Sequence, residues 1–282
     1  MKKLVIAILS FYSILSHSNM RGGEKDASLS KYEFGVGLTH VNYPKYPGSN
    51  ENESVTLPIP LFYYRGDIVR SDEDGGVRGR FFNNDHFEIN LSLGGAAPAS
   101  SKKIKAREGM PSLPFILEIG PGLIYKMIPS SDKHPFSLSL NIPVRVPIAF
   151  NDTKLDDRGL VFNPILFGYY NIIPKKFQTF YFATYRWGNR EYNETYYQVD
   201  PRFATASRNQ YQAKAGTVAT TLGLGFVYEI IKDWSFVTVA SFENLKSNAN
   251  KQSPLFKKDN QTLLVFALSW TFFKSDEKQK AY

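Results

Sequence analysis

Apolar and polar residues alternate along much of the chain, and the longest alternation lies at Pro135–Ile148. Its apolar members are Phe136, Leu138, Leu140, Ile142, Val144, Val146 and Ile148. A period of two predicts a β-strand with one apolar face and one polar face. At about 3.3 Å per residue the stretch is long enough to cross a hydrocarbon layer on a tilt, whereas strands of soluble proteins usually end after about five or six residues. The pattern therefore indicates a membrane-spanning strand.

Similar alternation predicts eleven more strands, and no helical period of useful length follows the N-terminal segment. The other strand candidates are Tyr32–Val41, Val55–Arg65, Asp67–Arg70, Val77–Phe82, His86–Ala97, Leu113–Met127, Gly159–Tyr170, Phe177–Gly188, Lys214–Glu229, Trp234–Leu245 and Thr262–Phe273. If 67–82 were one strand, the count would be eleven, and the last strand would end on the side opposite to the start of the first. Taking 71–76 (SDEDGG) as a loop gives twelve strands.

The connections between these strands sort into two groups by side. Those around residues 66, 83–85, 129–134, 172–176 and 231–233 are short. Most of those around 42–54, 71–76, 98–112, 151–158, 189–213 and 246–261 are long. Short turns on one side, long loops on the other and an even strand count are typical of outer-membrane barrels. We therefore predict an all-β fold: one antiparallel transmembrane β-barrel of about twelve strands, with short periplasmic turns and long extracellular loops.

Composition supports this class. Aromatic residues make up 15% of the chain, with 22 Phe and 17 Tyr, which suits the aromatic girdles of a barrel. The mean hydropathy of -0.29 argues against a helical membrane protein. Cysteine is absent, so the chain has no disulfide framework and no thiolate chemistry.

The N-terminal segment has the layout of a secretory signal peptide, with Lys2 and Lys3 before an apolar stretch and small residues at Ser16 and Ser18. An N-terminal membrane anchor is the alternative. We expect a signal peptide at 1–18, a periplasmic segment at 19–30, the barrel at 31–273 and a periplasmic tail at 274–282. The expected location is the outer membrane of a Gram-negative bacterium, in contact with its lipid.

An enzyme is the weaker interpretation of this sequence. The chain has four histidines, and the pattern brings no two of His40, His86 and His134 together as a catalytic or zinc-binding set would require. The glycines around Gly223–Gly225 are not a phosphate loop, because no helix follows them. We expect no catalytic residue, metal or cofactor. Nor does a basic stripe with a known module indicate nucleic-acid binding.

Polar residues on the faces opposite the apolar positions should point into the lumen, since a charge facing lipid near the midplane costs about 2–4 kcal/mol. These lumen or pore candidates are Glu33, Glu88, Asn90, Glu118, Arg145 and Arg186. They either cross-link into a plug or line a narrow pore, and Arg145 with Glu118 or Glu88 is the candidate constriction. The loop at 189–213 supplies candidates for extracellular contacts, although the same residue types are ordinary at a barrel rim. They are Tyr192, Tyr196, Tyr197, Arg202 and Arg208.

Several segments, in order along the chain, resemble the MipA/OmpV family of MltA-interacting proteins. They are Tyr46–Ser49 (YPGS), Leu57–Gly66 (LPIPLFYYRG), Gly109–Tyr125, Ile142–Ile148 (IPVRVPI), Tyr196–Val199, Arg208–Gly216 and Gln252–Phe256 (QSPLF). The chain departs from this family in one respect. Barrels of this kind commonly end on an aromatic residue, whereas here the tail KSDEKQKAY follows Phe273.

The resemblance implies a non-enzymatic outer-membrane barrel with one of two roles. The first is a scaffold that links a lytic transglycosylase and a murein synthase, both peptidoglycan-remodelling enzymes of the periplasm, to the outer membrane. The alternative is a porin-like channel for small solutes or antibiotics. The short turns and the tail offer a periplasmic partner little surface.

Overall fold

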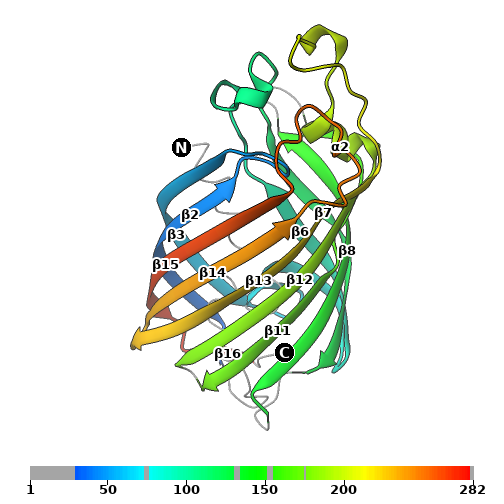
Figure 1. Ribbon diagram of the computed structural model, residues 1–282. Helices are drawn as coiled ribbons and strands as arrows, with labels where there is room; N and C mark the ends of the chain where they lie inside the picture. Colours follow the sequence, from blue (N-terminus) through cyan, green and yellow to red (C-terminus); the bar gives the residue numbers. More distant parts are fainter. Residues whose placement is uncertain (1–28, 73–75, 130–133, 151–154, 175, 280–282) are drawn as a thin grey trace.

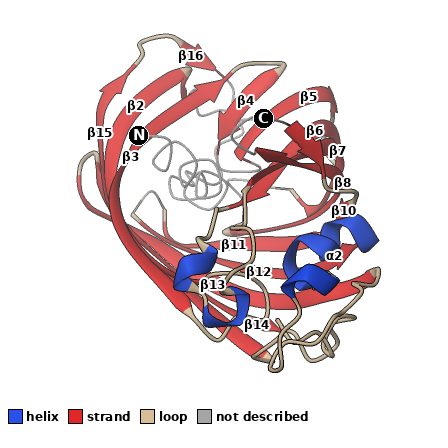
Figure 2. Cartoon of the chain, turned by 90° about the horizontal axis from the view of Figure 1, so that it is seen from above, coloured by secondary structure: helices blue, strands red, loops and turns tan. Residues whose placement is uncertain are grey.

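The protein is a closed antiparallel β-barrel with its longer loops gathered at one end (Figures 1 and 2). This computed structural model describes residues 29–72, 76–129, 134–150, 155–174 and 176–279. The expected signal peptide at 1–18 lies outside the described residues. Consecutive strands of the wall are neighbours, and β15 pairs with β2 to close the ring.

Twelve strands make the wall, which confirms the predicted barrel and strand count. They are β2 (Tyr32–Pro44), β3 (Asn52–Arg65), β4 (Val69–Asp72), β5 (Gly76–Asn83), β6 (Phe87–Ala96), β7 (Phe115–Ile128), β8 (Phe136–Phe150), β11 (Ile165–Ile173), β12 (Phe177–Gly188), β13 (Gly216–Ile231), β14 (Trp234–Asn244) and β15 (Asn260–Lys274).

The predicted strand at Gly159–Tyr170 is interrupted. Val161–Phe162 form the short strand β10, which pairs with both β8 and β12, and β11 begins only at Ile165. Pro164 lies between them and has no N–H for a ladder. A further short strand, β9 (Leu155–Asp157), pairs with β8.

Side chains alternate between the two faces of the wall as the sequence pattern predicts. On β2, Phe34, Val36 and Leu38 are exposed on the outer face, whereas Glu33 and Thr39 are buried inside. Aromatic rings pack on the outer face near the short turns, such as Trp234 on Trp270 and Phe34 on Phe62. These rings match one of the aromatic belts of a membrane barrel.

The C-terminal tail does not leave the barrel freely over its described length. Lys278–Gln279 form β16, which pairs with β1 (Leu29–Ser30). Lys31 and Glu277 form an ion pair of 2.6 Å beside this ladder. The described parts of the expected periplasmic segment and tail, Leu29–Ser30 and Lys278–Gln279, are thus joined at the end of the barrel that carries the short turns.

One helix appears where no helical period was predicted. It is α2 (Arg190–Tyr197), and the side chain of Asn189 caps it by accepting the N–H of Tyr192 at 3.1 Å. The described loops also contain three 3-10 helices: η2 (Ser101–Lys103), η3 (Lys105–Arg107) and η4 (Pro201–Phe203). Among the described helices, none is long and apolar enough to span a membrane.

Candidate functional site: the lumen and its loop cap

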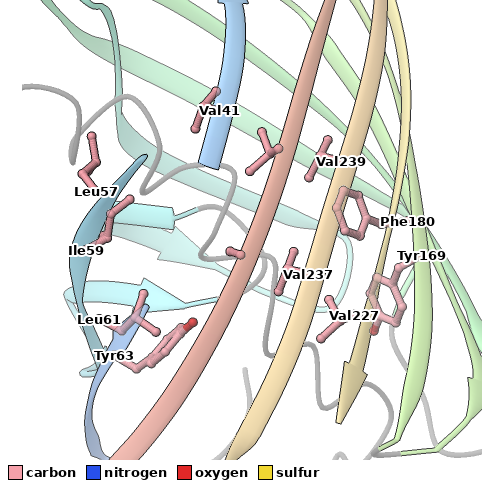
Figure 3. Close-up of a cluster of buried hydrophobic side chains, with 12 residues drawn as sticks. Val41, Leu57, Ile59, Leu61, Tyr63, Tyr169, Phe180, Val227, Val237 and Val239 are labelled. Atoms are coloured by element: carbon pink, nitrogen blue, oxygen red, sulfur yellow. The ribbon is translucent and has the colours of Figure 1, made fainter. Parts of the chain in front are cut away.

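The inward face of the barrel divides into a polar arc and an apolar arc. From β4 to β8 the inward side chains are mostly charged or amide groups. From β11 round to β3 they are mostly aliphatic or aromatic, although Glu33, Arg65 and Arg186 also point inward there. The apolar arc consists of Val41, Leu57, Ile59, Leu61, Tyr63, Tyr169, Phe180, Val227, Val237, Val239, Val265 and Ala267. Figure 3 labels ten of these residues on β2, β3, β11, β12, β13 and β14.

Arg145 and Glu118 are in contact inside the barrel. This is one of the two pairings predicted for Arg145, the other being with Glu88. Arg145 on β8 donates from Nη1 to Oε2 of Glu118 on β7 at 3.4 Å, and from Nη2 to Oγ of Ser92 on β6 at 2.8 Å. Gly94 makes room for this contact, since a Cβ there would lie 2.8 Å from Nη1 of Arg145. Three neighbouring strands therefore hold one guanidinium against the wall.

Glu88 pairs with a different arginine. Nε of Arg78 on β5 donates to Oε1 of Glu88 on β6 at 2.6 Å, and Nδ2 of Asn90 donates to the same oxygen at 3.0 Å. The alternative constriction of Arg145 with Glu88 is therefore not the one that the structure forms. Oδ1 of Asn90 and Oε1 of Glu118 are buried without a protein partner, so two acceptors remain for water or a solute.

Glu33 lies near the periplasmic end, in a third buried ion pair. Its Oε1 accepts from Nη1 of Arg65 at 2.7 Å, and the same Nη1 donates to the backbone oxygen of Ser30 at 2.7 Å. Arg65 is 1% exposed and Glu33 3%. The pair therefore connects the barrel wall to the β1–β16 ladder.

Sequence reasoning missed the inward arginines of β3 to β5. Arg65, Arg70, Arg78 and Arg80 are all buried. The signal was present in residues 76–80 (GVRGR), where the two arginines are spaced by two and must share a face. Arg70 and Arg78 are directly paired across β4 and β5, so both point inward.

Arg186 links the wall to the loop cap. Its Nη1 lies 3.3 Å from the hydroxyl of Tyr192 in α2, and its Nη2 lies 3.4 Å from Oδ1 of Asn163. All six lumen candidates thus have side chains on the inward side. Two pairs of them are in contact, Glu118 with Arg145 and Glu88 with Asn90.

The long loops pack into one cap over the extracellular end. Its buried apolar residues come from four loops and from the strand ends beneath them. They are Tyr46, Ile104, Leu113, Ile116, Val161, Tyr192, Tyr196, Tyr197, Ala213, Val218, Ala219 and Leu245. We call this set the cap core.

The structure corrects the expected position of three contact candidates. Tyr192, Tyr196 and Tyr197 were expected at an exposed rim, but they are at most 4% exposed and lie in the cap core. The reason is α2, which turns one face of the loop inward. Burial raises the pKa of Tyr196 and Tyr197 well above the usual 10, so both stay neutral.

Arg202 and Arg208 differ in accessibility. The Arg202 side chain is 75% exposed and stacks on Phe203, with its guanidinium carbon 4.7 Å from the ring centre. Arg208 is nearly buried and donates to the backbone oxygens of Ala106 and Glu108, at 3.2 and 2.9 Å. Arg208 therefore ties two loops together, and Arg202 alone of the five loop candidates is strongly exposed.

Hydrogen bonds between loops make the cap a single unit. Nε2 of Gln261 donates to the backbone oxygens of Tyr46 and Ser49, at 3.0 and 2.7 Å. Nη1 of Arg107 donates to the backbone oxygen of Tyr196 at 3.1 Å. Burial lowers the pKa of Arg107 to about 10, which still leaves it charged at neutral pH.

The described histidines lie apart from one another. His40 contacts Thr56, and His86 and His134 are exposed at other turns. Groups of His, Cys, Asp or Glu that could hold a metal ion are absent from the described residues.

Comparison with known proteins gives one family match and several similar solved structures. The family model described as MltA-interacting protein MipA matches residues 35–272. No curated protein matches the sequence. Similar solved structures include an outer-membrane channel from Pseudomonas putida F1 (9% identity, 89% of this chain and 98% of the other, TM-score 0.45) and the NanC porin (10%, 83% and 98%, 0.41). Outer membrane phospholipase A from Escherichia coli is also similar (10%, 92% and 97%, 0.34).

The family match covers nearly all of the barrel wall, from β2 to β15. The register closes the wall into a ring, and the outer face carries the apolar residues that lipid requires. The chain therefore belongs to the MipA family of MltA-interacting proteins and is an outer-membrane β-barrel of the Gram-negative type.

Proposed function

We propose that this barrel is a non-enzymatic scaffold that holds peptidoglycan-remodelling enzymes, a lytic transglycosylase and a murein synthase, at the outer membrane. The family description, an MltA-interacting protein, supports an enzyme partner. The observation that carries the proposal is the cap core. Four loops share buried apolar residues and inter-loop hydrogen bonds over the mouth, an arrangement that suits a barrel serving as a fixed platform.

A periplasmic partner would dock on the short turns. Lys176 and Lys232 are exposed on neighbouring turns of this side, after β11 and β13. The backbone oxygen of Lys176 accepts the N–H of Glu229 at 2.8 Å, which holds the β11–β12 turn against β13. Exposed lysines suit an acidic patch on a partner, and such rim charges act chiefly on the association rate.

The test is binding of the purified barrel in nanodiscs to the purified lytic transglycosylase of the same organism. We expect Lys176→Glu with Lys232→Glu to slow association several-fold. The matched control is Lys246→Glu with Lys257→Glu, the same charge change on exposed lysines of the extracellular loops. Absence of binding by the wild-type barrel, or equal loss in both double variants, would contradict the scaffold role.

The absence of enzymatic activity is part of this proposal, and the contacts of the inward carboxylates support it. Three of the inward carboxylates, Glu33, Glu88 and Glu118, are each paired with an arginine, and the described histidines lie apart from them. A general base needs a partner or substrate within hydrogen-bond reach. Incubation with phospholipid vesicles and peptidoglycan should therefore release no product, whereas turnover would refute this part of the proposal.

A porin-like channel for small solutes or antibiotics is the second candidate, favoured by the unpartnered acceptors of Asn90 and Glu118 in the polar arc. In that case Arg145 would be the constriction. Arg145→Ala should then change the ion selectivity of the open pore. Unchanged selectivity in a conducting barrel would exclude Arg145 from that role.

A further inference from the structure

A pocket of about 340 Å³ lies on the outer face of the wall, where the neighbouring strands β13 and β14 (Figure 1) approach the extracellular loops. Leu222 is 60% exposed and Phe242 46%, and both point away from the lumen. The pocket is therefore open to the surroundings of the barrel. We call it the outer-face pocket, and it is lined by Thr220, Leu222, Phe242, Asn244, Lys246 and Ser247.

The position of the pocket along β14 places it at the outer boundary of the membrane. Trp234, at the other end of β14, stacks on Trp270 in the aromatic belt near the short turns. The strand has 11 residues from Trp234 to Asn244. At about 3.4 Å per residue and a tilt of about 40° such a strand rises by roughly 26 Å, which matches the apolar band of about 25 Å in membrane barrels. The pocket therefore lies where the hydrocarbon of the outer leaflet gives way to headgroups.

The lining of the pocket changes from apolar to polar in the same direction. Leu222 and Phe242 are directly paired and give the pocket an apolar floor. On the next rung of the same face, Thr220 pairs with Asn244, and both are polar. The remaining lining residues lie beyond this rung, in the β14–β15 loop. The pocket thus suits an amphiphile whose polar head points toward the loops.

The polar part of the pocket offers hydrogen-bond donors and a positive charge. Oδ1 of Asn244 accepts the backbone N–H of Lys246 at 3.0 Å, which leaves Nδ2 of Asn244 as a donor. The side chain of Lys246 is exposed, and within the described chain it forms no ion pair. Asp259, in the same loop, is paired with Lys251 at 3.0 Å. An ammonium and an amide donor without a facing carboxylate favour an anion such as phosphate.

We propose that the outer-face pocket binds a phosphate-bearing lipid of the outer leaflet. The phosphate lies against Lys246 and Asn244, and an acyl chain lies over Leu222 and Phe242. On the rung below, β14 presents the small, exposed Ala240, so the chain can follow the strand toward the midplane. The level of the pocket in the membrane favours lipid over a partner protein or a second copy of the chain. The proposal is independent of the scaffold role.

Native mass spectrometry of the purified barrel in detergent tests the headgroup contact. The probe is lipid A, a diphosphorylated glycolipid, and the neutral lipid digalactosyl diacylglycerol serves for comparison. We expect Lys246→Gln to weaken the binding of lipid A several-fold and to leave the binding of the neutral lipid unchanged, because only the charge is lost. The matched control is Lys257→Gln, which removes the same charge from another exposed lysine of this loop and should bind lipid A like the wild type.

Several results would overturn the proposal. One is a wild-type barrel that binds no lipid A. Another is an equal loss of binding in both lysine variants, since net charge alone would then attract the lipid. Unchanged binding of lipid A in Lys246→Gln, or equal weakening for both lipids, would likewise exclude the phosphate contact. A wild-type dimer that carries no lipid and dissociates in Phe242→Ala would assign the pocket to a second copy of the chain.

The apolar floor is tested separately with Leu222→Ala, which keeps the charge. This variant should weaken the binding of lipid A and of the neutral lipid alike, because it removes contacts with the acyl chain. Leu268→Ala, which changes another exposed leucine of the outer face, is the control and should weaken neither. Equal binding by Leu222→Ala and the wild type would contradict the position of the acyl chain.

Discussion

Tyr197 is the residue whose replacement should test the cap most sharply. Its side chain is fully buried in the cap core, and its hydroxyl accepts from Nδ2 of Asn248 at 2.8 Å. Its backbone oxygen accepts from Oγ of Ser253 at 2.7 Å, and its ring lies 6.5 Å from that of Phe256. The side chain thus joins α2 to the β14–β15 loop.

Two substitutions separate packing from hydrogen bonding. Tyr197→Ala leaves a cavity and should destabilise the cap by about 3–5 kcal/mol, as aromatic-to-alanine changes in cores do. Tyr197→Phe removes only the hydroxyl, and Asn248 keeps its bond to the backbone oxygen of Val218 at 2.9 Å. The expected cost is about 1 kcal/mol. A free-energy change of about 1.4 kcal/mol changes an equilibrium constant tenfold. Tyr197→Ala should therefore raise the fraction of molecules with an open cap by roughly a hundredfold or more.

Limited trypsin digestion of the barrel in nanodiscs is the assay. Exposed basic residues of the cap, such as Arg202 and Lys251, are its cleavage sites. We expect much faster loop cleavage in Tyr197→Ala, a small change in Tyr197→Phe, and an intact barrel in both. Replacing the lipid-facing Tyr181 with alanine is the control. Cleavage of Tyr197→Ala at the wild-type rate would refute the packed cap.

Two further predictions concern charged contacts. Arg65→Met leaves Glu33 buried without its ion pair and should lower the free energy of unfolding, measured by urea titration, by about 3–5 kcal/mol. Adding Glu33→Leu should restore much of that free energy. A double variant as unstable as the single variant would count against the pair. Burial raises the pKa of Glu51, but the hydrogen bonds from Lys45 and from the Lys105 amide outweigh it and bring the pKa below 4.5. The contribution of the Glu51 carboxylate to stability is therefore complete above pH 4.5 and is lost as the pH falls through its lowered pKa. The NMR chemical shift of the Lys105 amide should move only below pH 4.5. In Glu51→Gln it should not titrate.

The strands could be predicted because each must satisfy lipid on one side. At β8, Val144 and Val146 face outward and Arg145 inward, as the alternation required. Taking residues 71–76 as a loop predicted an even number of strands, and the structure has two strands there, β4 and β5. Period-two patterning sets the faces of a strand before its neighbours are known.

The cap could not be predicted, because it depends on which strands and loops lie side by side. Tyr196 and Tyr197 look like rim residues in sequence, and only their packing against three other loops buries them. Pro58 and Pro60 lie on the part of β3 that pairs with β2 and not with β4, a position that also follows only from register. The partners of inward charges, such as Arg78 for Glu88, likewise follow from register.

The most direct test of the closed platform is single-channel recording of the chain lacking residues 1–18, refolded and inserted into a planar bilayer. Insertion is verified independently by the heat-dependent gel mobility of the recovered protein. The cap predicts a silent barrel for the wild type and discrete conductance steps for Tyr197→Ala. Reproducible steps from the wild-type barrel would contradict the closed platform and would favour the channel.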